Sequence, residues 1–231
     1  MSCTKSSEVP WHTAVKTMLE PMASSDKALQ MQKYMRDQFK FYGIPSTLRR
    51  ESLKPLFTKE RLPETEALPG IIRELWLLPQ REFQMVAIDL LIKRKNQLPE
   101  TYLPEVEWLI TTKSWWDTVD LLATHIVGTL FINYPEKANE FIRRWRFSDN
   151  VWLRRTALLY QLKFKQQTDE KLLFEIIKEN KADREFFIQK AIGWALREFS
   201  KTNPAAVVSF IDQHNIQGLA KREGLKWLSE H

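Results

Sequence analysis

The residues best suited to chemistry lie in segment 112–120, where two tryptophans and two aspartates follow one another closely. Trp116 and Asp120 are four residues apart, so in a helix both side chains project from one face. Trp115 points about 100° away from them, because a helix has roughly 3.6 residues per turn. Two leucines follow Asp120, and a carboxylate in such an apolar helix requires a cap, an ion pair or a site. A reactive carboxylate and a salt bridge to Arg155 both remain open.

Basic residues and a further tryptophan occur at related positions later in the chain. Arg154 and Arg155 fall just inside an expected helix start, and Lys163 follows about two turns later. Lys190 and Trp194 have the same four-residue spacing as the first tryptophan–aspartate pair. If these helices line one groove, a carboxylate is flanked by indole rings and surrounded by cations.

Such a groove suits an unusual ligand. Indole faces and a carboxylate attract positive charge, whereas lysine and arginine attract phosphates. DNA carrying an alkylated, cationic base fits both requirements. The competing interpretations are that the tryptophans only pack in the core, the commoner fate of tryptophan, and that the charges only form a solvated face.

Composition narrows the functional classes. The 231 residues are 43% hydrophobic and 28% charged, which is typical of a globular protein, and the net charge of +6 permits nucleic-acid binding. The chain has a single cysteine and four histidines, none of them at metal-ligand spacing, so no metal site is predicted. It also has no glycine-rich phosphate loop, so no nucleotide cofactor is predicted. No apolar run long enough to span a membrane and no secretory signal are seen, so an intracellular location is expected.

Helical periodicity extends along nearly the whole chain. In segment 81–95, apolar residues follow the i, i+3, i+4, i+7 pattern of one helix face, and period-2 alternation is missing. The pattern predicts an all-α protein. The expected helices cover roughly residues 10–22, 26–41, 46–59, 64–77, 80–96, 102–112, 115–132, 136–146, 150–165, 169–180, 184–200, 204–214 and 218–229. Pro204 is expected at the first position of its helix with Asn203 as the N-cap, and Ser114 is expected as the N-cap of the helix that follows it.

The long helices also repeat. Met85, Asp120, Arg155 and Lys190 lie 35 residues apart, and a shorter helix precedes each long one. Helix pairs with this period indicate an α-solenoid, in which equivalent positions line one surface, usually the concave one.

Several segments together resemble a known family, the HEAT-like-repeat alkylpurine DNA glycosylases of the AlkD type. The matching segments are QKYMRDQFKFYGI (32–44), IIRELWLLPQREFQ (71–84), TKSWWDTVD (112–120), SDNVWLRR (148–155), QLKFKQ (161–166), EFFIQKAIGWALREFSKTNP (185–204) and KREG (221–224). The resemblance implies one domain over residues 1–231, a curved array of HEAT-like helix pairs with a concave basic groove. Residues 1–8 match nothing in the family and are expected to be flexible.

The resemblance also implies an activity. Members remove N3- and N7-alkylated purines, such as 3-methyladenine and 7-methylguanine, from duplex DNA by hydrolysing the N-glycosidic bond. The reaction needs no metal or cofactor and leaves the lesion stacked, whereas most glycosylases flip their target base. Matched by position, Asp120, Trp116 and Trp194 are the expected catalytic residues of a monofunctional enzyme of base excision repair.

The same matching assigns DNA contacts. Tyr34 is expected across the groove, and Arg155 and Lys163 are expected to hold the backbone near the lesion. Lys113, Arg154 and Lys190 complete the predicted DNA-binding set. A monomer in the cytoplasm, associated with the nucleoid when bound to DNA, is expected.

Two other classes of protein remain open from the sequence. A non-catalytic DNA-binding repeat protein would use the same basic groove without Asp120. A protein-interaction scaffold, a common role of α-solenoids, would instead present an apolar or acidic surface.

Overall fold

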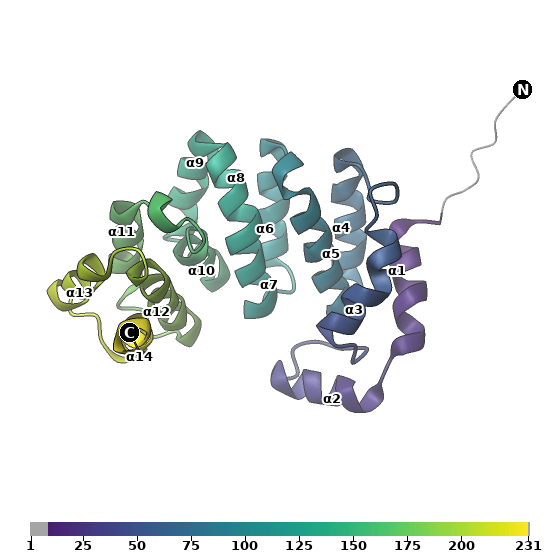
Figure 1. Cartoon of the computed structure of the whole chain (residues 1–231), viewed down its shortest axis with the longest axis horizontal. Coiled ribbons are helices and arrows are strands. Elements are labelled where there is room, and N and C mark those ends of the chain that lie inside the picture. The colour runs from purple at the N-terminus through teal and green to yellow at the C-terminus, as the bar shows by residue number, and fades with distance from the viewer. Residues whose placement is uncertain (1–8, 231) are drawn as a thin grey trace, which may run out of the picture. The chain divides into compact units, whose positions relative to one another are not determined.

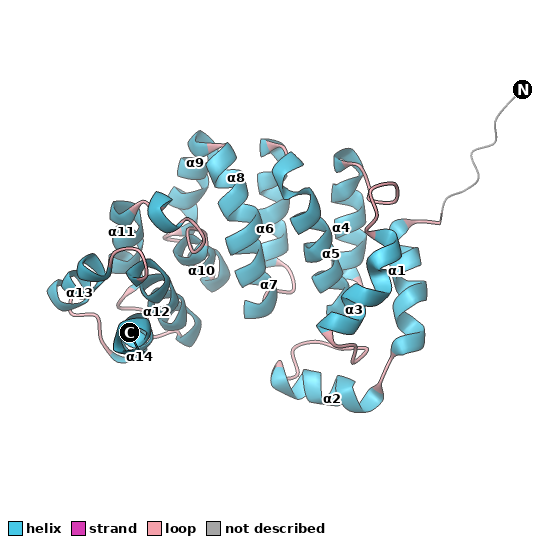
Figure 2. Cartoon of the chain, viewed as in Figure 1, coloured by secondary structure: helices cyan, strands magenta, loops and turns pink. Residues whose placement is uncertain are grey.

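The computed structural model describes residues 9–230, and these form helices joined by short loops (Figures 1 and 2). No strand is present in this part of the chain, and one isolated bridge joins Lys40 to Gln80. The all-α prediction is confirmed. The chain divides into two compact units, one ending at Arg94 and the other beginning at Lys95. The expected flexibility of residues 1–8 lies outside the described residues.

The first unit is built on five α-helices whose apolar faces meet. In α5, the face predicted from periodicity is buried, including Phe83, Val86 and Leu90, each at most 1% exposed. Burial of this face is the main stabilising contribution. The helices are α1 (Trp11–Leu19), α2 (Ser25–Tyr34), α3 (Ser46–Leu53), α4 (Leu68–Leu77) and α5 (Arg81–Arg94).

A buried carboxylate fixes the loop between α2 and α3. Glu82 is 2% exposed, and its oxygens accept the backbone N–H groups of Tyr42, Gly43 and Ile44 at 2.9–3.1 Å. Gly43 has φ +84°, and a Cβ there would lie 2.3 Å from the carbonyl oxygen of Ser24. Only glycine fits this close approach, and the three hydrogen bonds to Glu82 hold the loop in place.

The second unit consists of helix pairs. Its second helices α7, α10, α12 and α14 pack side by side in that order, and α9, α11 and α13 pack against them. The helices are α6 (Leu103–Thr111), α7 (Trp116–Leu121), α8 (Gly128–Asn133), α9 (Pro135–Trp145), α10 (Val151–Leu159), α11 (Glu170–Asn180), α12 (Phe186–Ser200), α13 (Pro204–Gln213) and α14 (Gly218–Glu230).

Polar contacts between successive pairs follow the predicted period. They join residues 33–37 positions apart, which is one helix pair along the chain, and so confirm the repeat. These contacts are Glu107–Arg144, Asp120–Arg155, Arg146–Glu179 and Glu170–Asn203.

The structure departs from the predicted helix 115–132 in the middle of this range. A π-helical segment, η6 (Leu122–Val127), separates α7 from α8, and the N–H of Gly128 donates to the carbonyl of Ala123 five residues back. The Thr124 hydroxyl donates to the carbonyl of Asp120 at 2.8 Å. This bond helps to satisfy the backbone where the helical pattern changes.

Helix starts were predicted with mixed success. Pro204 begins α13, and the Asn203 side chain caps it by accepting the N–H of Ala206. Ser114, the expected cap of α7, instead donates its hydroxyl to the carbonyl of Ile110 at 2.6 Å, and Trp115 occupies the cap position. The hydroxyl finds a closer acceptor at the end of the preceding helix, which sequence spacing does not show.

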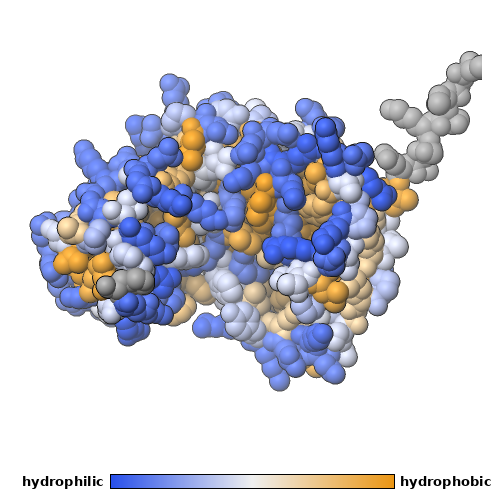
Figure 3. All heavy atoms as spheres, in the orientation of Figure 1, coloured by the Kyte–Doolittle hydropathy of each residue, from blue (hydrophilic) through white to orange (hydrophobic). Residues whose placement is uncertain are grey.

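The surface seen in Figure 3 is mainly hydrophilic, with separate hydrophobic patches. None of the helices in the described residues is both long and apolar enough to cross a membrane.

Gly193 tests how tightly the helices of the second unit pack, and Gly70 of the first unit serves as its control. A Cβ on Gly193 in α12 would lie 2.5 Å from Cβ of Glu223 and 3.0 Å from the carbonyl oxygen of Ala220, both in α14. A Cβ on Gly70 in α4 meets nothing within 4 Å. We expect Gly193→Ala to lower the free energy of unfolding by about 1–3 kcal/mol. The matched Gly70→Ala should raise it by about 0.5–1 kcal/mol. Urea unfolding followed by circular dichroism measures both, and equal effects would contradict the packing described.

Candidate active site

A bidentate ion pair joins Asp120 of α7 to Arg155 of α10. Nε of Arg155 donates to Oδ1 of Asp120 at 2.7 Å, and Nη2 donates to Oδ2 at 2.8 Å. The two side chains are only 13% and 6% exposed. The salt bridge that the sequence left open is therefore present. Paired, nearly parallel bonds of this kind fix the orientation of the carboxylate as well as its charge.

Arg155 also contacts the next helix pair. Its Nη1 donates to the carbonyl oxygen of Phe187, at the start of α12, and its guanidinium lies 5.9 Å from the centre of the Phe187 ring. One arginine thus connects α7, α10 and α12. All three of these hydrogen bonds go to protein groups, and two of them hold the Asp120 carboxylate in place.

Burial has a chemical consequence for Asp120. Desolvation raises the pKa of its carboxyl group above the ordinary value, while the hydrogen bonds and charge of Arg155 oppose the rise. The charge of Asp117 adds a smaller upward contribution. The carboxylate is therefore more easily protonated than an exposed aspartate, although an arginine holds it.

The predicted tryptophans are not core residues. Trp116 is the first residue of α7, one turn before Asp120, and Trp194 lies in α12; both are half-buried. Trp76 and Trp145, in contrast, are completely buried. Partial exposure leaves the two site tryptophans accessible to a ligand.

A second set of aromatic rings was not predicted as a group. Trp115, Trp152 and Phe187 contact one another, with ring centres 4.9–5.7 Å apart. They come from the starts of α7, α10 and α12. Because Phe187 also accepts a hydrogen bond from Arg155, this cluster supports the ion pair.

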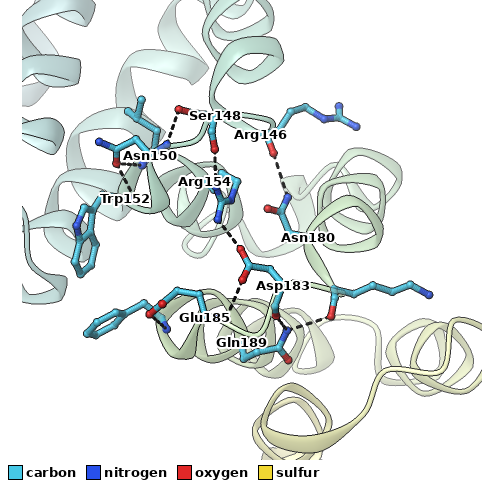
Figure 4. Close-up of polar contacts among 12 residues, drawn as sticks. Arg146, Ser148, Asn150, Trp152, Arg154, Asn180, Asp183, Glu185 and Gln189 are labelled. Atoms are coloured by element: carbon cyan, nitrogen blue, oxygen red, sulfur yellow. Dashed lines mark hydrogen bonds and ion pairs between the residues drawn. The ribbon is translucent and has the colours of Figure 1, made fainter.

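Two more of the predicted DNA-binding cations, besides Arg155, are paired with carboxylates. Arg154 donates to Asp183 at 2.5 Å and to the carbonyl of Ser148 at 2.6 Å, which fastens the start of α10 to the loop before α12 (Figure 4). Lys190 donates to Glu223 of α14 at 2.9 Å. Sequence reasoning missed Glu223, whose only signal is its position 33 residues after Lys190.

The other residues predicted to contact DNA are Lys163, Lys113 and Tyr34. Lys163 follows α10 in an exposed turn, and its Nζ lies 2.5 Å from Nε2 of His125. Lys113 lies in the loop between α6 and α7 with φ +51°. Tyr34 ends α2 in the first unit and is 71% exposed.

Among residues 9–230, no three histidine, cysteine or acidic side chains are grouped as a metal site would require.

Stacked helix pairs with a repeat of about 35 residues define an α-solenoid, and Asp120 with Arg155, Trp116 and Trp194 is its candidate site. Residues 15–228 match the family model described as DNA alkylation repair enzyme. The chain belongs to this family of DNA alkylation repair enzymes.

A solved structure supports the assignment. The chain is similar to a structure titled "Predicted DNA alkylation repair enzyme from Enterococcus faecalis", with 34% sequence identity and a TM-score of 0.82. The match covers 90% of this chain and 98% of the other. The predicted family and its HEAT-like α-solenoid fold are confirmed. Among curated proteins, none matches the chain.

The ion pair makes a testable contribution to stability. At pH 8, Arg155→Met should lower the free energy of unfolding by about 3–5 kcal/mol, because it leaves a buried carboxylate without its cation. Without Arg155, the pKa of Asp120 lies still further above its unfolded value. The variant then keeps more of its stability at low pH, where Asp120 is protonated, and loses it as the pH rises. The difference in free energy of unfolding between the variant and the wild type should therefore be smaller at pH 5 than at pH 8.

A double-mutant cycle separates this coupling from lost packing. In the Arg155→Met background, adding Asp120→Asn should restore part of the stability, because the amide needs no counter-ion. Arg144→Met, which breaks the more exposed pair with Glu107, should cost about 1 kcal/mol or less. Simple additivity of the two site substitutions would show that the pair is not coupled.

Proposed function

We propose that this repair enzyme is a monofunctional DNA glycosylase that releases N3- and N7-alkylated purines from duplex DNA. The observation that carries the proposal is the oriented Asp120 carboxylate, bound by Arg155 and one helical turn from the half-buried Trp116. Membership of the DNA alkylation repair family supplies the substrate class, DNA carrying alkylation damage.

The carboxylate suits the reaction that such lesions require. Breaking the bond between a purine and its deoxyribose generates oxocarbenium character on the sugar, as in glycoside hydrolysis. Asp120 stabilises this developing positive charge and orients or deprotonates the attacking water. Because Arg155 already fixes the carboxylate, little reorganisation is needed when the charge develops.

The two indoles assist the same charge. In this proposal Trp116 and Trp194 contact the deoxyribose and stabilise its positive charge through their π faces. An alkyl group at N3 or N7 makes the purine cationic and therefore a good leaving group. A strong general acid is not needed, and selectivity for charged lesions follows from their own lability, with the base left stacked rather than flipped.

DNA binding is assigned to the cations around this site. We place Lys163 against the backbone near the lesion, and Arg155 mainly as the positioning residue for Asp120. DNA contacts by Tyr34, Lys113, Arg154 and Lys190 stay predictions. A single chain acting as a monomer in base excision repair is also part of the proposal.

The decisive experiment is release of 7-methylguanine from duplex DNA under single-turnover conditions. Asp120→Asn should slow release by about 100- to 1000-fold, as loss of one electrostatic group in an active site commonly does. Glu107→Gln is the matched control, because it also removes the carboxylate of a bidentate arginine pair between repeats. It should retain wild-type activity.

Two results would reject parts of the proposal. If the wild type binds the duplex but releases no base, the protein is a non-catalytic DNA binder. If Asp120→Asn is fully active, the catalytic assignment is wrong. Circular dichroism of both variants controls for folding.

The raised pKa of Asp120 predicts the pH dependence of base release. Only the ionised carboxylate stabilises the sugar cation, so the rate should fall as the pH drops through a pKa above that of an ordinary aspartate. Arg155→Lys weakens the opposing hydrogen bonds and should move this acidic limb to higher pH. Release rates between pH 4.5 and 8, corrected for spontaneous depurination, measure the shift; an unmoved limb would argue against Asp120 as the titrating group.

A further inference from the structure

Two basic side chains of the second unit, those of Lys163 and His125, are in contact beside the site helix, and a third basic residue, Lys95, lies on a short helix that packs against α8. Lys163 Nζ lies 2.5 Å from Nε2 and 3.3 Å from Nδ1 of His125, which belongs to the π-helical segment η6. The short helix η4 (Lys95–Gln97) packs against α8, and the positive charge of Lys95 acts on both other groups. We call Lys95, His125 and Lys163 the basic triad.

The triad lacks the carboxylates that accompany the neighbouring cations. Arg154, Arg155 and Lys190 each form an ion pair with an acidic side chain. Burial lowers the pKa values of Lys163 and His125, and nearby lysine charges lower them further; no described carboxylate opposes the change. Like charges held together without a counter-ion repel one another, and an anion bound among them removes the repulsion.

The contact between Lys163 and His125 shows how the positive charge of the triad is limited when no anion is bound. An ammonium group donates hydrogen bonds and accepts none, so the imidazole nitrogen facing it must accept. His125 is therefore neutral in this arrangement. Burial lowers the pKa of His125 first, and the charges of Lys163 and Lys95 lower it further.

Other titratable groups around η6 are accounted for. This segment packs against α6, α7, α8 and α10. Lys163 follows α10, and α8 contributes no ionisable side chain. The ionisable side chains of the other three helices are Glu105 and Glu107 in α6, Asp117 and Asp120 in α7, and Arg154 and Arg155 in α10; none of them is a cause of the His125 shift.

The triad is fixed relative to the candidate active site. His125 follows Asp120 by five residues in one continuous helix, and the Thr129 hydroxyl donates to the carbonyl of His125 at 2.8 Å. A Cβ on Gly128 would lie 2.8 Å from the carbonyl oxygen of Tyr160, near the end of α10. The missing side chain allows the close approach that brings His125 next to Lys163.

We propose that the basic triad binds one phosphate group of the DNA backbone, and that His125 takes up a proton from solvent when the phosphate binds. The Lys163 ammonium then donates to a phosphate oxygen instead of to the imidazole, and the new imidazolium N–H donates to the same phosphate. The inference rests on the proposed function only in taking DNA as the source of the phosphate. It adds Lys95 and His125 to the contact already assigned to Lys163, and it makes DNA affinity depend on pH.

The test measures binding of an unmodified fluorescent duplex by anisotropy, as a function of KCl concentration, at pH 6 and pH 8. The wild type should bind more tightly at pH 6, by at most about tenfold per pH unit for one proton. Lys163→Gln and Lys95→Gln should each weaken binding, and loss of the phosphate contact should reduce the salt slope by about one. His125→Gln, which cannot be protonated, should bind like the wild type at pH 8 and lack the gain at pH 6.

Lys137→Gln is the matched control, because Lys137 is a surface lysine of α9 whose charge is paired with Glu140. Its salt slope and pH dependence should equal those of the wild type. The inference is overturned if the triad variants behave like this control, or if the wild type shows no gain at pH 6. Inorganic phosphate provides a second check. If it competes with the duplex for the wild type but not for the triad variants, while the variants bind the duplex as the wild type does, the triad is a free-phosphate site and the inference is also overturned.

The outcome is independent of catalysis. If the wild type releases no 7-methylguanine but its duplex binding depends on His125, the glycosylase proposal fails and the triad remains a DNA phosphate site. If base release occurs and the triad variants bind like the wild type, only the triad assignment fails.

Discussion

The bidentate pair of Asp120 and Arg155 connects stability, geometry and chemistry in this protein. A carboxylate buried in an apolar helix row needs a cation with good hydrogen-bond geometry, and the arginine of the next helix pair supplies it. The same guanidinium reaches the carbonyl of Phe187, so three successive second helices share one polar contact. The site is thus a product of the repeat: equivalent positions in neighbouring pairs face each other, and a negative residue in one is matched by a positive residue in the next.

The ion pairs between helix pairs change which positive charges are available to attract an anion. The sequence predicted DNA contacts for Arg155 and Lys190, and the structure shows both side chains paired with carboxylates, those of Asp120 and Glu223. Paired charges attract a distant polyanion less than unpaired ones do. Lys163 is different, because its nearest polar partner is the imidazole of His125. The structure therefore separates cations that are paired with carboxylates, such as Arg154, Arg155 and Lys190, from Lys163, which is not.

Much of the fold could be predicted, because it depends on local periodicity. The buried face of α5, the helix-pair repeat and the capping of α13 by Asn203 follow from spacing along the chain. The π-helical segment after α7 and the unused cap at Ser114 were not predicted. Both depend on which acceptor or neighbouring helix is closest in space, and helical periodicity holds no record of that distance.

For the site, the sequence by itself determined the residue types, the shared helix face of Trp116 and Asp120, and the family. It left two interpretations of Asp120 open, a reactive group or a salt-bridge partner. The tertiary structure shows the ion pair, with an orientation that also suits the proposed chemistry. It also brought Lys163 into contact with His125, which lies 38 residues away in the chain. The physical reason is that hydrogen-bond geometry, desolvation and charge coupling act over a few ångströms, and only packing of the helix pairs brings such groups within that range.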